Sequence, residues 1–320
     1  MNAVLLNVVN VSSHCIEEDR NLEHRRILSN MTLSKEKEEL LYNIVNDLKQ
    51  VDKVAAIVLG GSYAAGEATE TSDLDIGIYY SENKPFSTND IKLIAEKYSV
   101  NGKPTVTGFY EWGPWVNGGA WIETAYGNVD FVYRNVEHVN SIIERAKNGE
   151  WQNDFEQQPP YGFSSIIYLA ETRSCVSLYD PNEIVAKLKT AVQTYPSKLK
   201  ETVVKQSLWS AEFTIWHAEY FYRKQDAYNT IGCLTRAAKN IVTALFAINE
   251  LYPMGDKRAI DILENSDIRP LHFKERIETL LCTNKQAMGD NINSLKKLFN
   301  ETIKLTNGTY SPFYKLKSGQ

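Results

Sequence analysis

Two kinds of hydrophobic pattern divide the chain. In the first half, short apolar runs such as 54–59 and 76–80 have the length and the β-branched character of buried strands. Around them, apolar residues recur every three or four positions, as on the buried face of an amphipathic helix. The pattern predicts helices at 34–51, 88–98 and 136–147 and strands at 54–60, 73–80, 103–111, 120–124 and 129–133. Ser34 is the expected N-cap of the first helix.

The second half of the chain has the periodicity of helices throughout. The polar and aromatic stretch 151–161 contains Pro159-Pro160 and is the expected linker. Helical spacing follows in 182–195, 198–223 and 228–251, with two or three further helices to about residue 306. One of these helices carries an aromatic stripe, expected to form bundle core rather than a ligand site: Trp209, Phe213, Trp216 and Tyr220.

The combined pattern predicts an α+β chain. An N-terminal mixed β-sheet with flanking helices is expected first, followed by a C-terminal helical bundle. The predicted divisions are an N-terminal extension at 1–30, a sheet domain at 31–150 and a helical domain at 162–310. A cleft between the two domains is the expected position of an active site.

The strongest chemical signal lies where the first two strands end and begin. Gly60-Gly61-Ser62 follows the first strand, and Asp73-Leu74-Asp75 opens the second. Because side chains alternate along a strand, Asp73 and Asp75 share one face. Neighbouring carboxylates repel each other, so they suit a divalent cation better than they stabilise a fold. The glycines let the backbone approach a triphosphate, and Ser62 would open a helix whose free N–H groups favour an anion.

A third acid strengthens this interpretation. Asp130 is the only acid in the apolar strand 129–133, and two-metal sites for nucleotidyl transfer draw carboxylates from neighbouring strands. An Asp-x-Asp pair alone is more often a solvated strand end, and Gly-Gly-Ser alone is an ordinary turn. Their conjunction with Asp130 favours metal-assisted nucleotide chemistry.

With these features, the stretch 54–134 resembles the DNA polymerase β-like nucleotidyltransferase superfamily. The nearest likeness is to its small-substrate branch, which includes aminoglycoside and lincosamide nucleotidyltransferases. The resemblance implies a mixed sheet, an NTP donor, two Mg²⁺ ions and transfer of a nucleoside monophosphate. A second likeness, to bacterial proteins named only for this domain, lies in 115–121, 129–134 and 256–259 and supports the fold rather than a substrate.

Three further places could contribute to such a site. Glu171 could act as general base toward an acceptor hydroxyl, although a surface or salt-bridged glutamate is the more common case. Lys257 and Arg258 could reach nucleotide phosphates or simply be solvated loop charges. A cluster of tryptophans among glycines could stack a base or an acceptor ring, or form a packed corner: Trp112, Trp115 and Trp121.

Composition narrows the choice of partners. The 320 residues carry a net charge of −5, whereas a surface that binds nucleic acid phosphates is normally basic, so no nucleic acid partner is expected. The four cysteines are far apart and lack paired histidines, which argues against zinc and fits a reducing cytoplasm. No apolar run approaches the ~20 residues of a membrane span. The apolar opening 1–9 lacks a preceding basic residue, so a secretory leader is not favoured.

The sequence therefore predicts a cytoplasmic, Mg²⁺-dependent nucleotidyltransferase. An NTP, expected to be ATP, would donate a nucleoside monophosphate to a hydroxyl of a small acceptor such as an aminoglycoside-like compound. The residues assigned to catalysis are Asp73, Asp75, Asp130 and Glu171, the first three also as metal ligands, and those assigned to the nucleotide are Gly60, Gly61, Ser62 and Lys257.

Two alternatives stay open. One keeps the chemistry and takes a protein as acceptor, and the other is a non-catalytic nucleotide-binding regulatory protein. The complete set of three acids argues against the second alternative but does not exclude the first. The oligomeric state is also left open.

Overall fold

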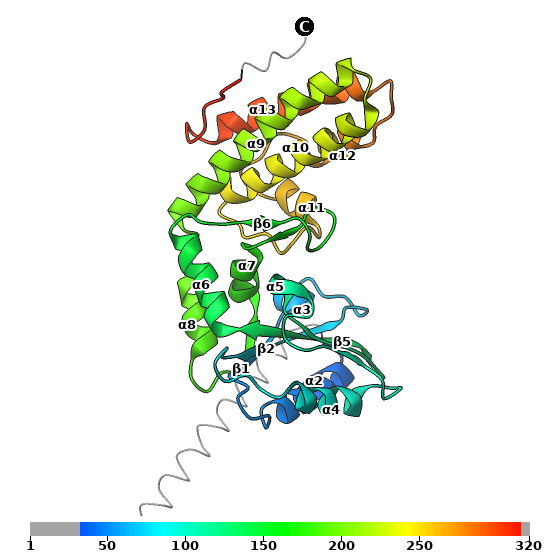
Figure 1. The fold of residues 1–320 in the computed structure, drawn as a ribbon, viewed down its shortest axis with the longest axis vertical. Helices are drawn as coiled ribbons and strands as arrows, with labels where there is room; N and C mark the ends of the chain where they lie inside the picture. Colours follow the sequence, from blue (N-terminus) through cyan, green and yellow to red (C-terminus); the bar gives the residue numbers. More distant parts are fainter. Residues whose placement is uncertain (1–32, 315–320) are drawn as a thin grey trace, which may run out of the picture. The chain divides into compact units, whose positions relative to one another are not determined.

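The computed structural model describes residues 33–314, so the predicted extension 1–30 lies outside the described residues. The chain divides into two compact units. Within the described range, the first unit comprises residues 33–139 and Ser174–Thr190, and the second comprises Asn140–Arg173 and residues from 191 onward. The first unit contains the main β-sheet and the second is largely helical (Figure 1).

Six strands form the sheet of the first unit. In spatial order they are β3 (Thr105–Val106), β4 (Gly119–Thr124), β5 (Gly127–Asn135), β2 (Leu74–Tyr80), β1 (Ala56–Leu59) and β8 (Val176–Tyr179). The β2–β5 pair is parallel and the other pairs are antiparallel. This mixed sheet is the one that the sequence predicts, and with the helices that follow it confirms the α+β fold class.

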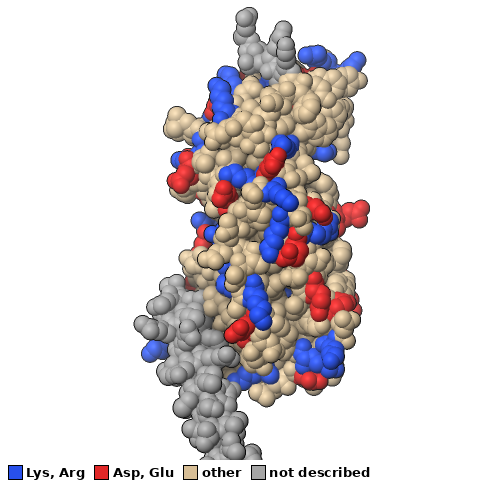
Figure 2. Space-filling model, turned by 90° about the vertical axis from the view of Figure 1, so that its left-hand side faces the viewer, with Lys and Arg blue, Asp and Glu red and all other residues tan. Residues whose placement is uncertain are grey.

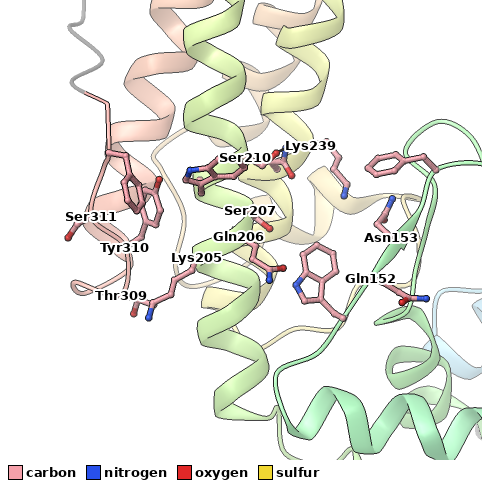
Figure 3. A pocket seen from close by; sticks show the side chains of 15 residues that line it. Gln152, Asn153, Lys205, Gln206, Ser207, Ser210, Lys239, Thr309, Tyr310 and Ser311 are labelled. Carbon is pink, nitrogen blue, oxygen red and sulfur yellow. Dashed lines mark hydrogen bonds between the residues drawn. The ribbon is translucent and has the colours of Figure 1, made fainter.

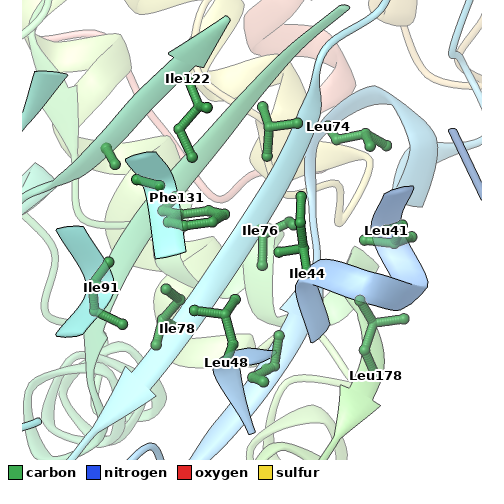
Figure 4. Packing of buried hydrophobic residues seen from close by; sticks show 14 of the residues in the cluster. Leu41, Ile44, Leu48, Leu74, Ile76, Ile78, Ile91, Ile122, Phe131 and Leu178 are labelled. Carbon is green, nitrogen blue, oxygen red and sulfur yellow. The ribbon is translucent and has the colours of Figure 1, made fainter. Parts of the chain in front are cut away.

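Two helices pack the hydrophobic core against one face of the sheet. They are α2 (Lys35–Leu48) and α4 (Thr88–Tyr98). Figure 4 shows Leu41 and Ile44 of α2 and Ile91 of α4 against Ile76 and Phe131 of the strands, and all five are fully buried. The remaining short helices of this unit are α3 (Gly61–Ala65), α5 (Gly113–Val116) and α8 (Ile184–Ala191).

The start of α2 follows the predicted capping. The Ser34 hydroxyl accepts a hydrogen bond from the N–H of Lys37 at 3.2 Å, which satisfies one of the free donors of the first turn. Glu36 and Glu38 lie in that turn, where negative charge is favoured by the helix dipole.

The second unit is built around a long helical pair. It contains α7 (Ile167–Ser174), α9 (Ser197–Arg223), α10 (Ala227–Ile248), α11 (Ala259–Glu264), α12 (Phe273–Leu281) and α13 (Met288–Leu305). The α9 and α10 helices pack along each other, and α13 contacts both. A small hairpin of β6 (Asn153–Asp154) and β7 (Phe163–Ser164) occupies the stretch expected to be a linker. Helix α6 (Val136–Lys147) crosses the boundary between the units.

Within the described residues, α10 alone is long and apolar enough to cross a membrane by length and composition. The sequence analysis expected no such stretch. Fifty-six per cent of the most apolar 18-residue stretch of α10 is buried inside the protein, and the helix packs against α9 and α13. Its composition is therefore accounted for by its place in the core of the helical unit.

Three expectations from the sequence are wrong. The strand expected at 103–111 is reduced to Thr105–Val106. The chain beyond the expected linker is not wholly helical, because β8 pairs antiparallel with β1. The aromatic stripe is not bundle core, since a share of each side chain meets solvent, from 36% to 51% exposed: Trp209, Phe213, Trp216 and Tyr220. Periodicity shows that these residues share a face of α9, but it does not show whether another element covers that face.

Candidate active site

A single row of residues crosses the sheet at the predicted site. Asp75 on β2 lies beside Asp130 on β5 in parallel register, and Asp130 faces Trp121 on β4. The N–H of Gly60, just after β1, donates to the carbonyl of Asp75 at 2.8 Å. Side chains directly opposite each other on neighbouring strands point to the same face. Asp75, Asp130 and Trp121 therefore stand together on one face, on strands about 4.8 Å apart.

This face is opposite to the hydrophobic core. Leu74 and Ile76 flank Asp75 in sequence and both belong to the buried cluster under α2 and α4. Asp75 and Asp130 are half-buried. Asp73 lies one residue before β2 and is also half-buried. The apolar alternation of β2 thus turns its acids away from the core, as the sequence predicts.

The glycine turn packs against the carboxylate of Asp75. Gly61 opens α3 with a φ of +58°, a left-handed conformation that side chains other than glycine rarely adopt. A Cβ atom placed on Gly61 would lie 1.7 Å from Oδ2 of Asp75, which is far inside van der Waals contact. Gly61 is therefore required twice, by its backbone conformation and by the closeness of the carboxylate.

A buried lysine that the sequence analysis missed holds the loop leading into the acidic strand. The Lys37 ammonium donates to the carbonyls of Glu70 and Ser72 at 2.9 and 2.8 Å and to the Tyr63 hydroxyl at 3.1 Å. Its side chain is only 8% exposed. Lys37 thereby joins α2 and α3 to the residue immediately before Asp73. The available signal was its position on the apolar stripe of α2, three residues before Leu40.

The tryptophan segment contains both kinds of site that the sequence left open. Trp112 and Trp121 stack with ring centroids 4.3 Å apart, and Trp121 is 52% exposed beside the acids. Trp115 is buried edge-on against His138, which is a packed corner. A Cβ on Gly119 would lie 1.8 Å from the carbonyl oxygen of Phe131, so this glycine serves the close approach of β4 to β5.

The remaining predicted residues lie in different places. Ser62 is the second residue of α3 and is half-buried. Glu171 lies half-buried on α7, and Lys257 and Arg258 are exposed in the loop before α11. These last three belong to the second unit, whereas the acids and the glycine turn belong to the first. The roles of Glu171 and Lys257 stay predictions.

The acids of the sheet face offer oxygen ligands for a metal ion. Within residues 33–314, no three His, Cys, Asp or Glu side chains gather closely enough to form a metal-binding group. Mg²⁺, however, is usually held by one or two carboxylates together with waters and substrate phosphates. The in-register pair Asp75 and Asp130 provides such an oxygen set. The pair fits one Mg²⁺ ion, and a site made by all three acids stays a prediction.

Comparison with known families agrees with this geometry. Residues 41–110 match the family model described as "Nucleotidyltransferase domain", a range that includes the glycine turn and the Asp-x-Asp strand. The protein therefore carries a nucleotidyltransferase domain and is an enzyme of that class, in agreement with the superfamily that the sequence resembles. No curated protein matches the chain.

Two solved structures show partial similarity to the chain. One is a nucleotidyltransferase-like protein from Exiguobacterium sibiricum 255-15, with 9% identity, a TM-score of 0.45, and 85% of this chain and 78% of that chain covered. The other is the spectinomycin adenyltransferase AAD(9) from Enterococcus faecialis, crystallised with ATP and spectinomycin. It shows 14% identity and a TM-score of 0.30, with 82% of this chain and 98% of that chain covered.

Proposed function

We propose that this nucleotidyltransferase domain moves a nucleoside monophosphate from an NTP, with ATP as the expected donor, to a hydroxyl of a small acceptor. The observation that supports this most is the row of Asp75, Asp130 and Trp121 on one sheet face, with Gly61 packed on the Asp75 carboxylate. The acceptor class, an aminoglycoside-like or similar polyhydroxyl compound, rests on the likeness of the motif to the antibiotic-modifying branch.

Each group of residues has a separate proposed role. Asp75 and Asp130, with Asp73, would hold Mg²⁺. When bound, the ion neutralises phosphate charge and promotes attack by the acceptor oxygen. The absence of a side chain at Gly61 makes room for the Asp75 carboxylate, and the backbone of the turn Gly60-Gly61-Ser62 is proposed to contact the triphosphate. The Trp112–Trp121 pair offers a flat surface beside the acids on which a base or an acceptor ring can stack.

The reaction is a displacement at the α-phosphorus. A bond forms between the acceptor oxygen and that phosphorus, and the bond to the bridging oxygen breaks, so pyrophosphate leaves. The acceptor hydroxyl must lose its proton, and Glu171 is proposed as the base on its sequence position alone.

The first experiment measures pyrophosphate release with ATP, Mg²⁺ and a panel of aminocyclitol and aminoglycoside acceptors. We expect acceptor-dependent release that falls at least ~100-fold in Asp75→Asn and in Asp130→Asn, because each change removes a carboxylate ligand of the Mg²⁺ that would balance the phosphate charge. Glu96→Gln, on α4 against the opposite face of the sheet, is the matched control and should retain activity. Unchanged turnover in Asp130→Asn would exclude this site.

The same panel separates the alternatives. Thermal stabilisation by ATP and Mg²⁺ without release on any acceptor would favour a nucleotide-binding protein. Transfer of label from α-labelled ATP to a protein band, with none to small acceptors, would favour a protein acceptor.

A further inference from the structure

The helical unit contains a cavity of about 850 Å³, and none of the residues assigned to nucleotidyl transfer lines it. Its lining comes from α9, α10, the segment 151–155 and the segment 309–313, all within the second unit (Figure 3). This volume is within the range of about 300–1,000 Å³ that is typical of small-molecule sites. Its position raises the question of which ligand its chemistry would suit.

Aromatic side chains make much of the wall. Trp151, Phe155, Trp209, Tyr310 and Phe313 all line the cavity. Trp209 is 45% exposed and stacks almost parallel on its neighbour Phe213, with an interplanar angle of 9°. Such surfaces favour a flat ring, because stacking adds to the gain from burying apolar area. The exposed aromatic stripe of α9 thus begins inside this cavity.

Two polar groups of the wall have no hydrogen-bond partner within residues 33–314. The Ser207 hydroxyl and the Trp151 Nε1–H are buried and have no hydrogen-bond partner among the described residues, and Ser207 is 1% exposed. Buried polar atoms are nearly always paired, so two unpaired ones beside one cavity are unusual.

The charge of the wall has one sign. Lys205 and Lys239 line the cavity, and none of the lining residues in the described chain is Asp or Glu. Lys205 is paired with Glu201 at 2.5 Å, whereas the ammonium of Lys239 makes no hydrogen bond or ion pair with the described residues. Burial lowers the pKa of Lys239. The carboxylate of Asp256 raises this pKa in part, and the positive charge of Arg236 lowers it further. The Lys239 ammonium is thus partly dehydrated and has no contacting partner.

One wall is fixed in place by a buried carboxylate. Glu212 is fully buried and accepts hydrogen bonds from the Tyr310 hydroxyl and from the backbone N–H groups of Phe313, at 3.1 Å, and Tyr314. This anchors the segment 309–313 against α9. The cavity is therefore formed in advance of any ligand, which reduces the ordering that binding requires.

We propose that this cavity binds a small aromatic monocarboxylate, with its ring against Trp209 and Trp151 and its carboxylate on Lys239. One lysine ammonium without a contacting partner matches one negative charge, and the aromatic wall matches a flat ring. None of its lining residues is assigned to the sheet site, so the two proposals rest on different residues.

Calorimetry on the full chain tests the proposal with 2-naphthoate and its neutral isostere 2-naphthamide as probes. We expect naphthoate to bind at least ~10-fold more tightly, because its carboxylate makes a charge-assisted hydrogen bond. In Lys239→Met this preference should vanish, while Lys205→Met, the matched loss of the paired lysine, should retain it. Equal binding of the two probes, or an unchanged preference in Lys239→Met, would overturn the proposal.

Two more measurements keep the result interpretable. If Lys239→Met fails to fold, the comparison of probes on the unaltered protein still decides, and Trp209→Ala, at a half-exposed position, should weaken naphthoate several-fold. Asp130→Asn should bind naphthoate normally, which separates this site from the nucleotide site. Loss of naphthoate binding in Asp130→Asn, or its displacement by ATP with Mg²⁺, would assign the probe to the sheet and refute a site in the helical unit.

Discussion

At the scale of single residues, the candidate site depends on positions that accept one side chain only. Gly61 combines a left-handed φ with a carboxylate against its Cα, and Lys37 meets three oxygen atoms with one ammonium. Neither residue is chemically reactive in the proposed transfer. Both determine where Asp73 and Asp75 lie, so their substitution should affect stability and activity together.

Gly66, which follows α3, provides a control for a substitution at Gly61. Gly61→Ala must resolve a 1.7 Å clash with Asp75 as well as adopt a left-handed φ, whereas Gly66 has a φ of +72° and nothing within 4 Å of an added Cβ. We expect Gly66→Ala to cost about 1–2 kcal/mol of unfolding free energy. Gly61→Ala should cost clearly more and should abolish nucleotidyl transfer. Urea denaturation and pyrophosphate release measure the two effects, and equal losses in both variants would contradict the packing argument.

The buried lysine gives a second comparison. Lys37→Met removes the donor of the part-buried carbonyls of Glu70 and Ser72 and a partner of the buried Tyr63 hydroxyl, which should cost about 1 kcal/mol. Lys35→Met, an exposed change on the same helix, should cost less than ~0.5 kcal/mol. Chemical denaturation compares the variants. A Lys37→Met protein as stable as Lys35→Met would show that the ammonium does not hold the loop.

At the scale of elements, the limits of helices were predicted better than the tertiary contacts that surround them. The predicted start of α2 and the limits of α4 and α6 agree with the structure because capping and periodicity are local properties. The strand β8 was missed because four residues after a helix carry too little pattern. The exposure of Trp209 and the register of Asp75 with Asp130 depend on tertiary contacts. The acids were found from sequence, but Lys37 and the cavity in the helical unit were not.

The contact between α12 and α13 has a predictable pH dependence. Arg276 donates to both oxygens of Glu301 at 2.7 and 2.8 Å, which lowers the pKa of Glu301 despite an opposing contribution from burial. The ion pair contributes its full stabilisation at pH values above the unfolded-state pKa of a glutamate, about 4.3. This stabilisation is lost as the pH falls through the lower pKa that Glu301 has in the folded protein. Because the pair is partly exposed, Glu301→Gln should cost only about 0.5–1 kcal/mol at pH 7.

Denaturation of Glu301→Gln and the unaltered protein at pH 7 and near pH 3 checks this expectation. The difference between them should shrink at the acid end. Asp267→Asn, at an exposed acid of the same unit, controls for the loss of one negative charge. A difference that stays constant with pH would mean that the loss does not arise from the ionised pair.

At the scale of the whole molecule, the distribution of charge indicates which partners the protein can bind. The net charge is −5, and on the face drawn in Figure 2 basic and acidic side chains are interspersed rather than gathered by sign. Phosphate backbones bind through clusters of Lys and Arg, and this binding weakens steeply with salt. The candidate sheet face is itself acidic.

We therefore expect no tight binding to tRNA or duplex DNA at physiological salt. A gel-shift titration with labelled tRNA measures this, and a basic RNA-binding protein serves as the positive control. Sub-micromolar binding at ordinary salt would contradict the charge argument and make RNA the leading acceptor.

The pairing of β8 with β1 has a consequence for how the protein can be made and divided. A fragment that stops at residue 150 contains the acids and the glycine turn but lacks Val176–Tyr179, so the backbone edge of β1 would be left open. All four residues of β1 are apolar and buried, and open apolar edges recruit strands from other molecules. During synthesis, the ribosome must likewise release more than thirty residues of the second unit before this edge can close.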